Sequence, residues 1–290
     1  MRLVMTLLVR DEEDILEDNL EFHRSMGVDH VVVTDNLSTD RTPQILERYA
    51  AQGWLTWRRE TDDDYSQYRW VTRMAREAVV HHGADWVINN DADEFWLPRR
   101  GDLKRAFAAV PDDVGVVSVS RADFLPRPEQ PGRFCDRLTV RTQWGEKYDG
   151  TRLLPKVAHR ADPQVEVAQG NHEASGPLLG TASTTDEVEI LHFPVRTYAQ
   201  YEHKTVVGGR AYRRNTDLPR NMGKRRRRDY KRYLQGTLRD WYDAHLLSDD
   251  QVAAGLTEGR LIEDRRLQEL LASPGSRPGV LRRLLRRAPG

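Results

Sequence analysis

The sequence predicts an α/β protein with a mostly parallel sheet flanked by helices and a C-terminal helical extension. Apolar segments of strand length alternate with amphipathic segments of helical spacing over residues 1–120, a pattern typical of βαβ units with parallel strands. Runs such as Val31–Val33 are apolar at every position, which indicates strands covered on both faces. After about residue 195 the sequence becomes basic and helical. We therefore expect two parts, residues 1–215 and residues 216–290.

Residues with known boundary preferences separate the expected elements. Thr42 and Pro43 are typical of an N-cap and first helical position, while Gly27, Gly53 and Gly83 follow expected helices, where glycine favours termination. The expected strands are residues 3–9, 30–34, 54–57, 85–89, 114–119, 137–142, 155–159 and 188–192. The expected helices are residues 15–26, 44–52, 67–82, 103–110, 198–214, 224–245 and 249–271.

The composition is that of a globular chain. Of 290 residues, 38% are hydrophobic and 31% are charged, which excludes a wholly disordered protein. No stretch approaches the ~18 consecutive apolar residues of a membrane-spanning helix. Residues 3–9 are too short for the apolar region of a signal peptide and are followed by acidic residues. The single cysteine, Cys135, excludes an internal disulfide and fits a reducing compartment. We therefore expect a cytoplasmic protein.

The charges are distributed unevenly, although 45 basic and 45 acidic residues cancel over the chain. Residues 1–100 carry 12 basic and 20 acidic side chains, whereas residues 201–290 carry 21 basic and 11 acidic ones. Such polarity fits a site that collects cations in one half and anions in the other. It also fits two solvated faces without a specific role.

Polar residues follow three expected strands at the edge where doubly wound sheets bind ligands. Residues 10–12 follow the first strand, residues 35–38 the second and residues 90–96 the fourth. The carboxyl ends of parallel strands meet at one edge, so these side chains should lie close together. Independent surface loops would not place polar groups so consistently.

Asp91 and Asp93 are the most specific chemical feature. Two carboxylates one residue apart at the end of a buried strand can converge on one hard cation. Mg²⁺ and Mn²⁺ prefer such oxygen ligands and usually leave positions for phosphate oxygens. The alternative is an acidic turn that caps the next segment. An EF-hand is disfavoured, because Trp96 stands where its calcium loop requires glycine.

Several segments together resemble family 2-like glycosyltransferases of the GT-A fold. Residues 83–96 resemble the metal-binding segment of that family, and residues 5–14 resemble its opening segment, although Asp11 departs from the usual Asn-Glu pattern. Residues 35–42 are similar to its nucleotide-contacting turn, and residues 190–204 to a later His/Lys segment. The resemblance spans about residues 3–210. It implies a GT-A-like catalytic domain over residues 1–215 and a nucleoside-diphosphate sugar donor, by default a UDP-sugar.

The resemblance also implies roles for the residues that match its motifs. The implied nucleotide-sugar-binding residues are Arg10, Asp11, Glu12, Asp35, Asp91, Arg196 and Lys204. The implied ligands of Mn²⁺ or Mg²⁺ are Asp91, Asp93 and His192, with His172 as a competitor of His192. Each has a simpler alternative: Asp35 can cap the next helix, a histidine on an apolar strand can be structural, and basic residues on a helix can be solvated.

Transfer with inversion requires a carboxylate that takes the proton of the acceptor hydroxyl. Negative charge grows meanwhile on the departing nucleoside diphosphate, where the metal and basic residues would stabilise it. Glu173 lies in a glycine-flanked, loop-like segment and is our candidate base. The alternatives are Asp123, Glu146 and Asp149.

Other functions fit parts of the pattern. A nucleotidyltransferase acting on sugar phosphates also needs strand-end carboxylates and a metal, and a non-catalytic nucleotide- or anion-binding protein could use the same edge. A dinucleotide-dependent oxidoreductase is disfavoured, because Val9–Glu12 contains no glycine. The acceptor, whether a glycan, a lipid-linked molecule or a small molecule, is left open by the sequence.

Basic residues of the last third could meet an anionic surface. Lys224–Arg228 is followed by Tyr230 and Tyr233, a composition that can hold nucleic acid. Because one helix carries it and the other parts of the chain are acidic, we expect no nucleic-acid partner. Val280–Arg287 spaces its apolar residues as an interfacial helix would. This spacing is compatible with peripheral contact with an anionic membrane at its inner face, although a frayed basic terminus is the simpler interpretation.

Overall fold

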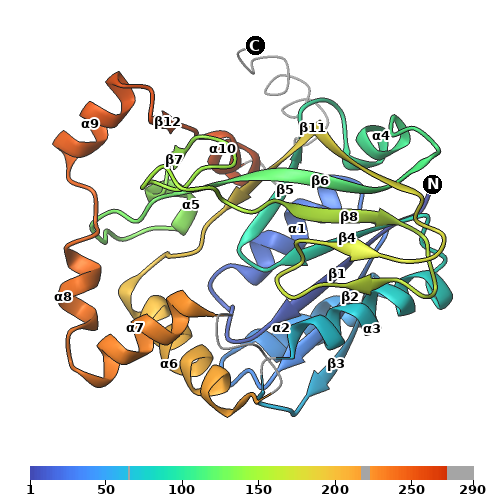
Figure 1. Ribbon diagram of the computed structural model, residues 1–290, viewed down its shortest axis with the longest axis horizontal. Helices are drawn as coiled ribbons and strands as arrows, with labels where there is room; N and C mark the ends of the chain where they lie inside the picture. Colours follow the sequence, from blue (N-terminus) through green and yellow to red (C-terminus); the bar gives the residue numbers. More distant parts are fainter. Residues whose placement is uncertain (65, 217–222, 273–290) are drawn as a thin grey trace.

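The structure is a computed structural model that describes residues 1–64, 66–216 and 223–272. Among these residues, eight strands form one sheet in the order β3-β2-β1-β4-β8-β6-β11-β5 (Figure 1). Its strands are β1 (Leu3–Val9), β2 (His30–Asn36), β3 (Leu55–Glu60), β4 (Trp86–Asp91), β5 (Glu94–Pro98), β6 (Val114–Asp123), β8 (Lys156–Arg160) and β11 (Thr181–His192). The helices that flank it are α1 (Leu16–Ser25), α2 (Thr42–Ala50), α3 (Gln67–Val80) and α4 (Leu103–Ala108).

Parallel pairing is confined to two parts of this sheet. Strands β3, β2, β1 and β4 are parallel neighbours, and β6 is parallel to β11. Strand β8 lies between β4 and β6 and runs antiparallel to both, while β5 pairs antiparallel with β11. The predicted α/β class is confirmed, and the strand order brings the ends of β1, β4 and β11 to one region of the sheet.

Alternation along the strands builds a hydrophobic core on each face of the sheet. Met5 and Ile88 belong to a large cluster that includes residues of α1, α2 and α4. Their strand neighbours Val4 and Val87 belong to a second cluster, which α3 covers. Successive strand side chains point to opposite faces, so a strand that is buried on both faces needs apolar residues at odd and at even positions. The continuous apolar runs in the sequence reflect this double coverage.

After β4 the structure differs from the expected elements in several places. Strand β5 occupies residues that the sequence analysis assigned to a strand-end loop. The expected strand 137–142 begins with the short helix α5 (Phe134–Arg137) before β7 (Val140–Thr142). The expected helix 224–245 is divided into α7 (Lys224–Leu234) and α8 (Leu238–Asp243). The expected helix 249–271 is divided into α9 (Asp249–Thr257), β12 (Leu261–Glu263) and α10 (Arg266–Ala272).

Both helix interruptions occur at glycines in the left-handed conformation. Gly236 has φ of +71° and Gly259 has φ of +70°, a region that glycine enters without the steric cost of a Cβ atom. Such a residue typically ends an α-helix. The basic and apolar spacing continues past each glycine, which is why spacing alone predicted longer helices.

The C-terminal part of the described chain packs back onto the N-terminal part. Strand β12 pairs antiparallel with β7, and α10 contributes Leu267 and Leu271 to the large core cluster. Helix α7 packs against α6 (Tyr198–Arg214) so closely that a Cβ atom added to Gly209 would lie 2.3 Å from Cγ of Tyr230. The described residues of the extension are thus anchored at two separate places, as Figure 1 shows.

Two earlier expectations concern membranes. The basic segment Val280–Arg287 lies outside the described residues. Within the described ranges, no helix combines the length and apolar character needed to cross a bilayer.

We expect Asp264→Asn to destabilise the β7–β12 anchor. The buried Asp264 carboxylate accepts hydrogen bonds from Arg141 Nε at 2.7 Å and from Arg266 Nη2 at 2.7 Å. Although burial opposes ionisation, these guanidinium groups lower the pKa of Asp264 to about 2. A carboxyl pKa lowered in the folded state stabilises the protein above pH ~4, and the effect disappears as the pH falls towards 2. The variant should lose roughly 2 kcal/mol at pH 7.

Urea unfolding of both proteins between pH 2 and pH 7 checks this expectation. The difference in unfolding free energy should be largest above pH ~4 and should shrink towards pH 2. A difference that is constant across this range would contradict an electrostatic role for Asp264.

Candidate active site

A cavity opens at the carboxyl ends of β1 and β4 and is covered by α6 and α7. Its walls combine strand-end residues with the first turns of α3 and the middle of α6. The lining residues are Leu8, Val9, Arg10, Glu12, Asn36, Gln67, Trp70, Asp91, Ala92, Asp93, His203, Lys204, Val207, Gly208 and Arg226. The cavity therefore lies at the edge of the sheet that the strand-end rule predicts. Four predicted site residues at the ends of β1 and β4 line it together with Lys204, namely Arg10, Glu12, Asp91 and Asp93.

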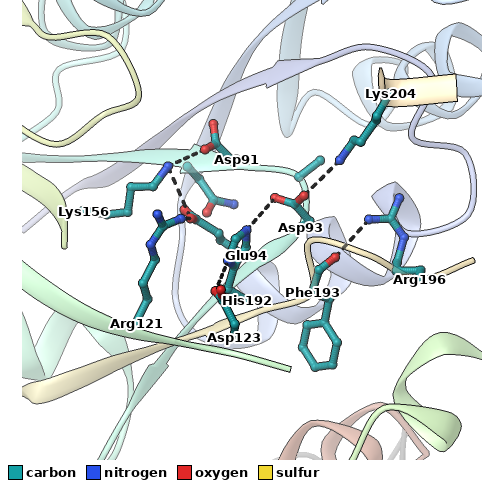
Figure 2. A network of polar contacts seen from close by, with 12 residues as sticks. Asp91, Asp93, Glu94, Arg121, Asp123, Lys156, His192, Phe193, Arg196 and Lys204 are labelled. Atoms are coloured by element: carbon teal, nitrogen blue, oxygen red, sulfur yellow. Dashed lines mark hydrogen bonds and ion pairs between the residues drawn. The ribbon is translucent and has the colours of Figure 1, made fainter. Parts of the chain in front are cut away.

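Asp93 lies at the centre of the charged groups beside this cavity (Figure 2). Its Oδ2 atom is 2.9 Å from Lys204 Nζ, and its Oδ1 atom is 3.6 Å from His192 Nε2. Burial alone would raise the carboxyl pKa, but the ammonium group of Lys204 and the ring of His192 hold the pKa of Asp93 well below its usual range. Asp93 is therefore an anion that faces an imidazolium on one side and an ammonium on the other.

His192 ends β11 and is oriented by a second carboxylate. In the sheet it is paired with Asp123 of β6 on one side and with Glu94 of β5 on the other. Its Nδ1 atom donates a hydrogen bond to Asp123 Oδ1 at 2.6 Å. Burial opposes protonation, but the adjacent Asp123 carboxylate raises the pKa of His192 to about 9. This hydrogen bond fixes the ring so that Nε2 faces Asp93.

The Asp93–His192 pair fits a divalent cation. Two ligand atoms that are each about 2.1 Å from one ion can lie up to about 4.2 Å apart, and Oδ1 of Asp93 and Nε2 of His192 are 3.6 Å apart. A carboxylate on the far ring nitrogen, here Asp123, is the usual support of a metal-binding histidine. No group of three or more acidic, histidine or cysteine side chains suited to a metal occurs within the described ranges. Asp93 and His192 can thus offer two ligands, with His192 losing the proton on Nε2 when a cation binds.

Asp91, one of the three expected cation ligands, contacts other groups in the structure. Figure 2 shows its carboxylate directed to Lys156 instead of towards the Asp93–His192 pair. Oδ2 accepts a hydrogen bond from Lys156 Nζ, and Oδ1 accepts bonds from Asn171 Nδ2 at 3.1 Å and Gln67 Nε2 at 3.3 Å. Strand β4 ends at Asp91 and β5 begins at Glu94. Because of the short turn between these strands, the two aspartates contact different partners.

Arg196 is buried inside the protein and does not line the cavity. Its Nε and Nη2 atoms donate to Asp14 at 2.6 and 2.7 Å, Nη2 also donates to Glu12 at 2.7 Å, and Nη1 donates to the carbonyl of Phe193. The guanidinium side chain has 0% exposure. The expected direct contact with a diphosphate is therefore replaced by a clamp that fixes Glu12 after β1.

Lys204, by contrast, lies where the sequence analysis expected a cation. It lines the cavity, and Nζ lies 2.7 Å from Glu12 Oε1 and 2.9 Å from Asp93 Oδ2. Burial opposes its charge, but Asp93 and Glu12 raise the pKa of Lys204. An ammonium group thus lies beside the candidate cation ligands, on helix α6.

The other predicted nucleotide contacts are divided between the cavity wall and its support. Arg10 lines the cavity, and its Nη1 atom donates to Asn36 Oδ1 at 3.2 Å. Asp11 lies behind the wall, where its Oδ1 accepts the Thr39 amide at 2.6 Å. The Asp35 side chain has 0% exposure and pairs with Arg59, so it supports the turn after β2, while its neighbour Asn36 reaches the cavity.

Glu173 does not line this cavity. It is exposed and lines a separate groove of about 510 Å³ between α3 and the strand pair β9 (Glu166–Val167) and β10 (Ala174–Ser175). Of its alternatives, Asp123 holds His192, and Glu146 and Asp149 are exposed. His172 donates through Nδ1 to the carbonyl of Pro155 at 2.6 Å and is not among the cavity residues. The structure therefore places no predicted base within the cavity wall.

The sequence analysis missed several residues of the site. On the cavity wall these are Asn36, Gln67, Trp70, His203 and Arg226. Behind it they are Lys156 and Asn171, which contact Asp91. A signal existed for Lys156, since a lysine that opens an otherwise apolar expected strand needs a buried counter-charge. Asn171 carries no comparable signal.

We expect Arg196→Met to destabilise the protein by about 3 kcal/mol, because removing one partner leaves the buried Glu12 carboxylate with less compensation. Arg196→Lys should cost less, since it keeps the charge and loses the two-pronged contact. Arg41→Met is the matched control: this arginine is 79% exposed and pairs with Glu13, so its loss should change stability by less than about 1 kcal/mol. Denaturant unfolding at pH 7 measures all three, and equal stability of Arg196→Met and the wild type would exclude the clamp.

Comparison with known proteins gives one family match. Residues 5–173, more than half of the chain, match glycosyltransferase family 92. The predicted family 2 is not the family that matches, although the broader prediction of a glycosyltransferase is confirmed. This match favours sugar transfer over the nucleotidyltransferase and the non-catalytic binding protein considered from the sequence. No curated protein matches the chain.

Several solved structures are similar to the fold at low sequence identity. S. aureus TarS 1–349 in complex with UDP is 12% identical, with 99% of this chain and 90% of that chain covered and a TM-score of 0.43. The mannosyltransferase PcManGT from Pyrobaculum calidifontis, in complex with GDP-Man and Mn²⁺, is 16% identical, with 98% and 86% covered and a TM-score of 0.41.

Proposed function

Because the chain belongs to glycosyltransferase family 92, we propose that it transfers a sugar from a nucleoside-diphosphate sugar to an acceptor hydroxyl with the help of a divalent cation. The observation that carries this proposal is the Asp93–His192 pair beside Lys204 at the cavity edge. The pair provides two cation ligands, and Asp93 also contacts the ammonium group of Lys204. A departing diphosphate needs such a concentration of positive charge.

The nucleoside would occupy the cavity between β1, β4 and the start of α3. Trp70 offers an aromatic wall, and Arg10 and Asn36 offer polar groups at the β1 and β2 ends. Asp91, which also lines the cavity, would accept a hydrogen bond from a ribose hydroxyl. UDP is the first nucleotide to test, because the family 2-like segments imply a UDP-sugar by default.

Asp93 Oδ1 and His192 Nε2 would hold Mn²⁺ or Mg²⁺, with the diphosphate and water completing its coordination. When bound, the cation supplies Lewis-acid stabilisation of the leaving diphosphate. Asp123 keeps the His192 ring in the orientation that presents Nε2. The ammonium group of Lys204 keeps Asp93 ionised, as a cation ligand must be, whereas His192 would release its Nε2 proton when the cation binds.

Lys204 would provide a second positive charge to the diphosphate from the side of α6. Glu12 and Asp93 hold its ammonium group in place, and Arg196 in turn fixes Glu12. The positive charge is therefore positioned before the donor binds, so little reorganisation is needed as the leaving group develops charge.

We expect nucleotide binding to require a divalent cation and both of its proposed ligands. Titration calorimetry with UDP and with GDP, in MnCl₂, MgCl₂ or EDTA, measures this. EDTA, Asp93→Asn and His192→Ala should each weaken binding by about tenfold or more, because removing even a group that supports a metal ligand typically costs 10–100-fold. Asp112→Asn is the matched control, since Asp112 is fully exposed. Binding that is insensitive to EDTA would contradict the proposed cation site.

The base for acceptor activation stays a separate proposal, and Glu173 is its candidate. Its loop reaches the site through Asn171, which contacts Asp91. Glu173→Gln should reduce sugar transfer by about 10²–10⁴-fold without weakening nucleotide binding. Glu166→Gln is the control, because Glu166 lines the same groove on the paired strand. Transfer rates are measured with an acceptor found in a panel of glycans and small hydroxyl compounds, and a wild-type rate for Glu173→Gln would exclude it as the base.

A further inference from the structure

Strand β8 carries a buried lysine, Lys156, that contacts Asp91. This strand enters antiparallel between β4 and β6, and its first residue, Lys156, pairs with Val119 of β6. The Lys156 side chain is only 2% exposed, and its ammonium group contacts Asp91 Oδ2 and lies 3.2 Å from Glu94 Oε1. Figure 2 shows Lys156 between these two carboxylates.

The buried charges around Lys156 balance. Arg121 Nη1 lies 2.8 Å from Glu94 Oε1, so two cations face the two carboxylates of Asp91 and Glu94. A buried ammonium is tolerated only with such compensation. Burial opposes its charge, but Asp91 and Glu94 raise the pKa of Lys156, so it is a permanent cation at neutral pH.

Asn171 holds Asp91 from a second direction. It has φ of +60° and 0% exposure, a backbone conformation that is uncommon for residues other than glycine. Its carbonyl accepts the amide of Val157 at 3.1 Å, which ties its loop to the strand that carries Lys156. Its Nδ2 atom donates to Asp91 Oδ1 at 3.1 Å, and Gln67 Nε2 donates to the same oxygen at 3.3 Å.

The number of donors determines what Asp91 can still bind. An ionised carboxylate offers about four acceptor positions, and Lys156, Asn171 and Gln67 occupy three of them. About one acceptor position of Asp91 is left. Asp91 is therefore suited to accept one hydrogen bond from a neutral donor such as a hydroxyl.

We propose that Lys156 and Asn171 are positioning residues that hold Asp91 as the acceptor for one ribose hydroxyl of the nucleotide. This inference rests on the proposed function, which places a nucleotide in the cavity. It adds two buried residues that do not line the cavity and that act through Asp91. A purely structural role of Lys156, as the counter-charge of Glu94, is the competing explanation, and the variants must separate the two.

The experiment compares Glu94→Gln with the double variant Glu94→Gln/Lys156→Met. Both lack the buried Glu94 charge, so they differ only in the lysine that contacts Asp91. Titration calorimetry with UDP and GDP in MnCl₂, well below the melting temperature of each variant, should show at least tenfold weaker binding for the double variant. Equal binding by the two folded proteins would restrict Lys156 to neutralising Glu94 and overturn the inference.

Asn171→Gly provides a second variant without a buried charge change. Glycine keeps the positive φ and removes the side chain that donates to Asp91 without adding or removing a charge, so the fold should persist even if the double variant does not fold. Binding should weaken about threefold to tenfold, in line with the loss of one hydrogen bond to a charged acceptor. Wild-type affinity of Asn171→Gly would overturn the inference.

A double-mutant cycle identifies Asp91 as the intermediary. In a background with Asp91→Asn and Glu94→Gln, adding Lys156→Met should change nucleotide affinity less than twofold, because contacting residues that act as a unit are not additive. An undiminished further loss would mean that Lys156 acts by another route and would overturn the inference. If the wild-type protein binds neither nucleotide, the proposed function fails and this inference fails with it; normal wild-type binding with insensitive variants defeats this inference alone.

Discussion

A line of alternating charges along one edge of the sheet determines how the site is built. Each member contacts the next, and each comes from a different element or connection. In order, the members are Arg196, Glu12, Lys204, Asp93, His192 and Asp123. Single buried charges would be costly, and each member of the series compensates its neighbours. Docking of α6, the ends of β1 and β11, and the turn after β4 are therefore mutually dependent.

The short connection between β4 and β5 places Asp91 and Asp93 in two different chemical environments, although the two residues lie within three positions of the sequence. Asp91 is surrounded by hydrogen-bond donors from β8, α3 and the loop before β10. Asp93 meets the imidazole of His192 and the ammonium of Lys204. The first environment suits a carboxylate that accepts a hydroxyl, and the second suits one that shares a cation with a histidine. One Asp-x-Asp sequence thus supplies two different sites of contact, because β4 and β5, which follow each other in the sequence, are not neighbours in the sheet.

What the sequence could predict depended on local periodicity and on the strand-end rule. The parallel strands β1, β2 and β4 were predictable because each is a continuous apolar run, and their carboxyl ends necessarily share an edge. Placement of Lys204 close to Asp93 followed only from a resemblance, since the two residues are far apart in the sequence. The insertion of β8 between β4 and β6 was not predictable, because strand order depends on pairing between distant segments.

The same limit explains the errors of detail. Arg196 and Lys204 are both basic residues after β11, and nothing local distinguishes the buried clamp from the cavity cation. Their difference comes from what surrounds them: Arg196 meets Asp14 and Glu12 inside the protein, whereas Lys204 faces the cavity. Left-handed glycines such as Gly236 interrupt helices without disturbing the spacing of the flanking side chains.

The opposite charges of the two ends of the sequence now have a partial physical cause. Lys204 pairs with Glu12, and Arg214 pairs with Asp63, so basic residues of α6 compensate acidic residues that follow β1 and β3. The buried Asp229 of α7 engages Arg232 of its own helix at 2.6 Å. Part of the basic excess is thus an internal counter-charge, and a count along the sequence overstates the positive charge offered to partners. Lys204, which faces the cavity, is positioned by Glu12 and Asp93, the acidic strand-end residues that it neutralises. The separation of acidic and basic residues along the sequence therefore serves the fold as well as the proposed chemistry.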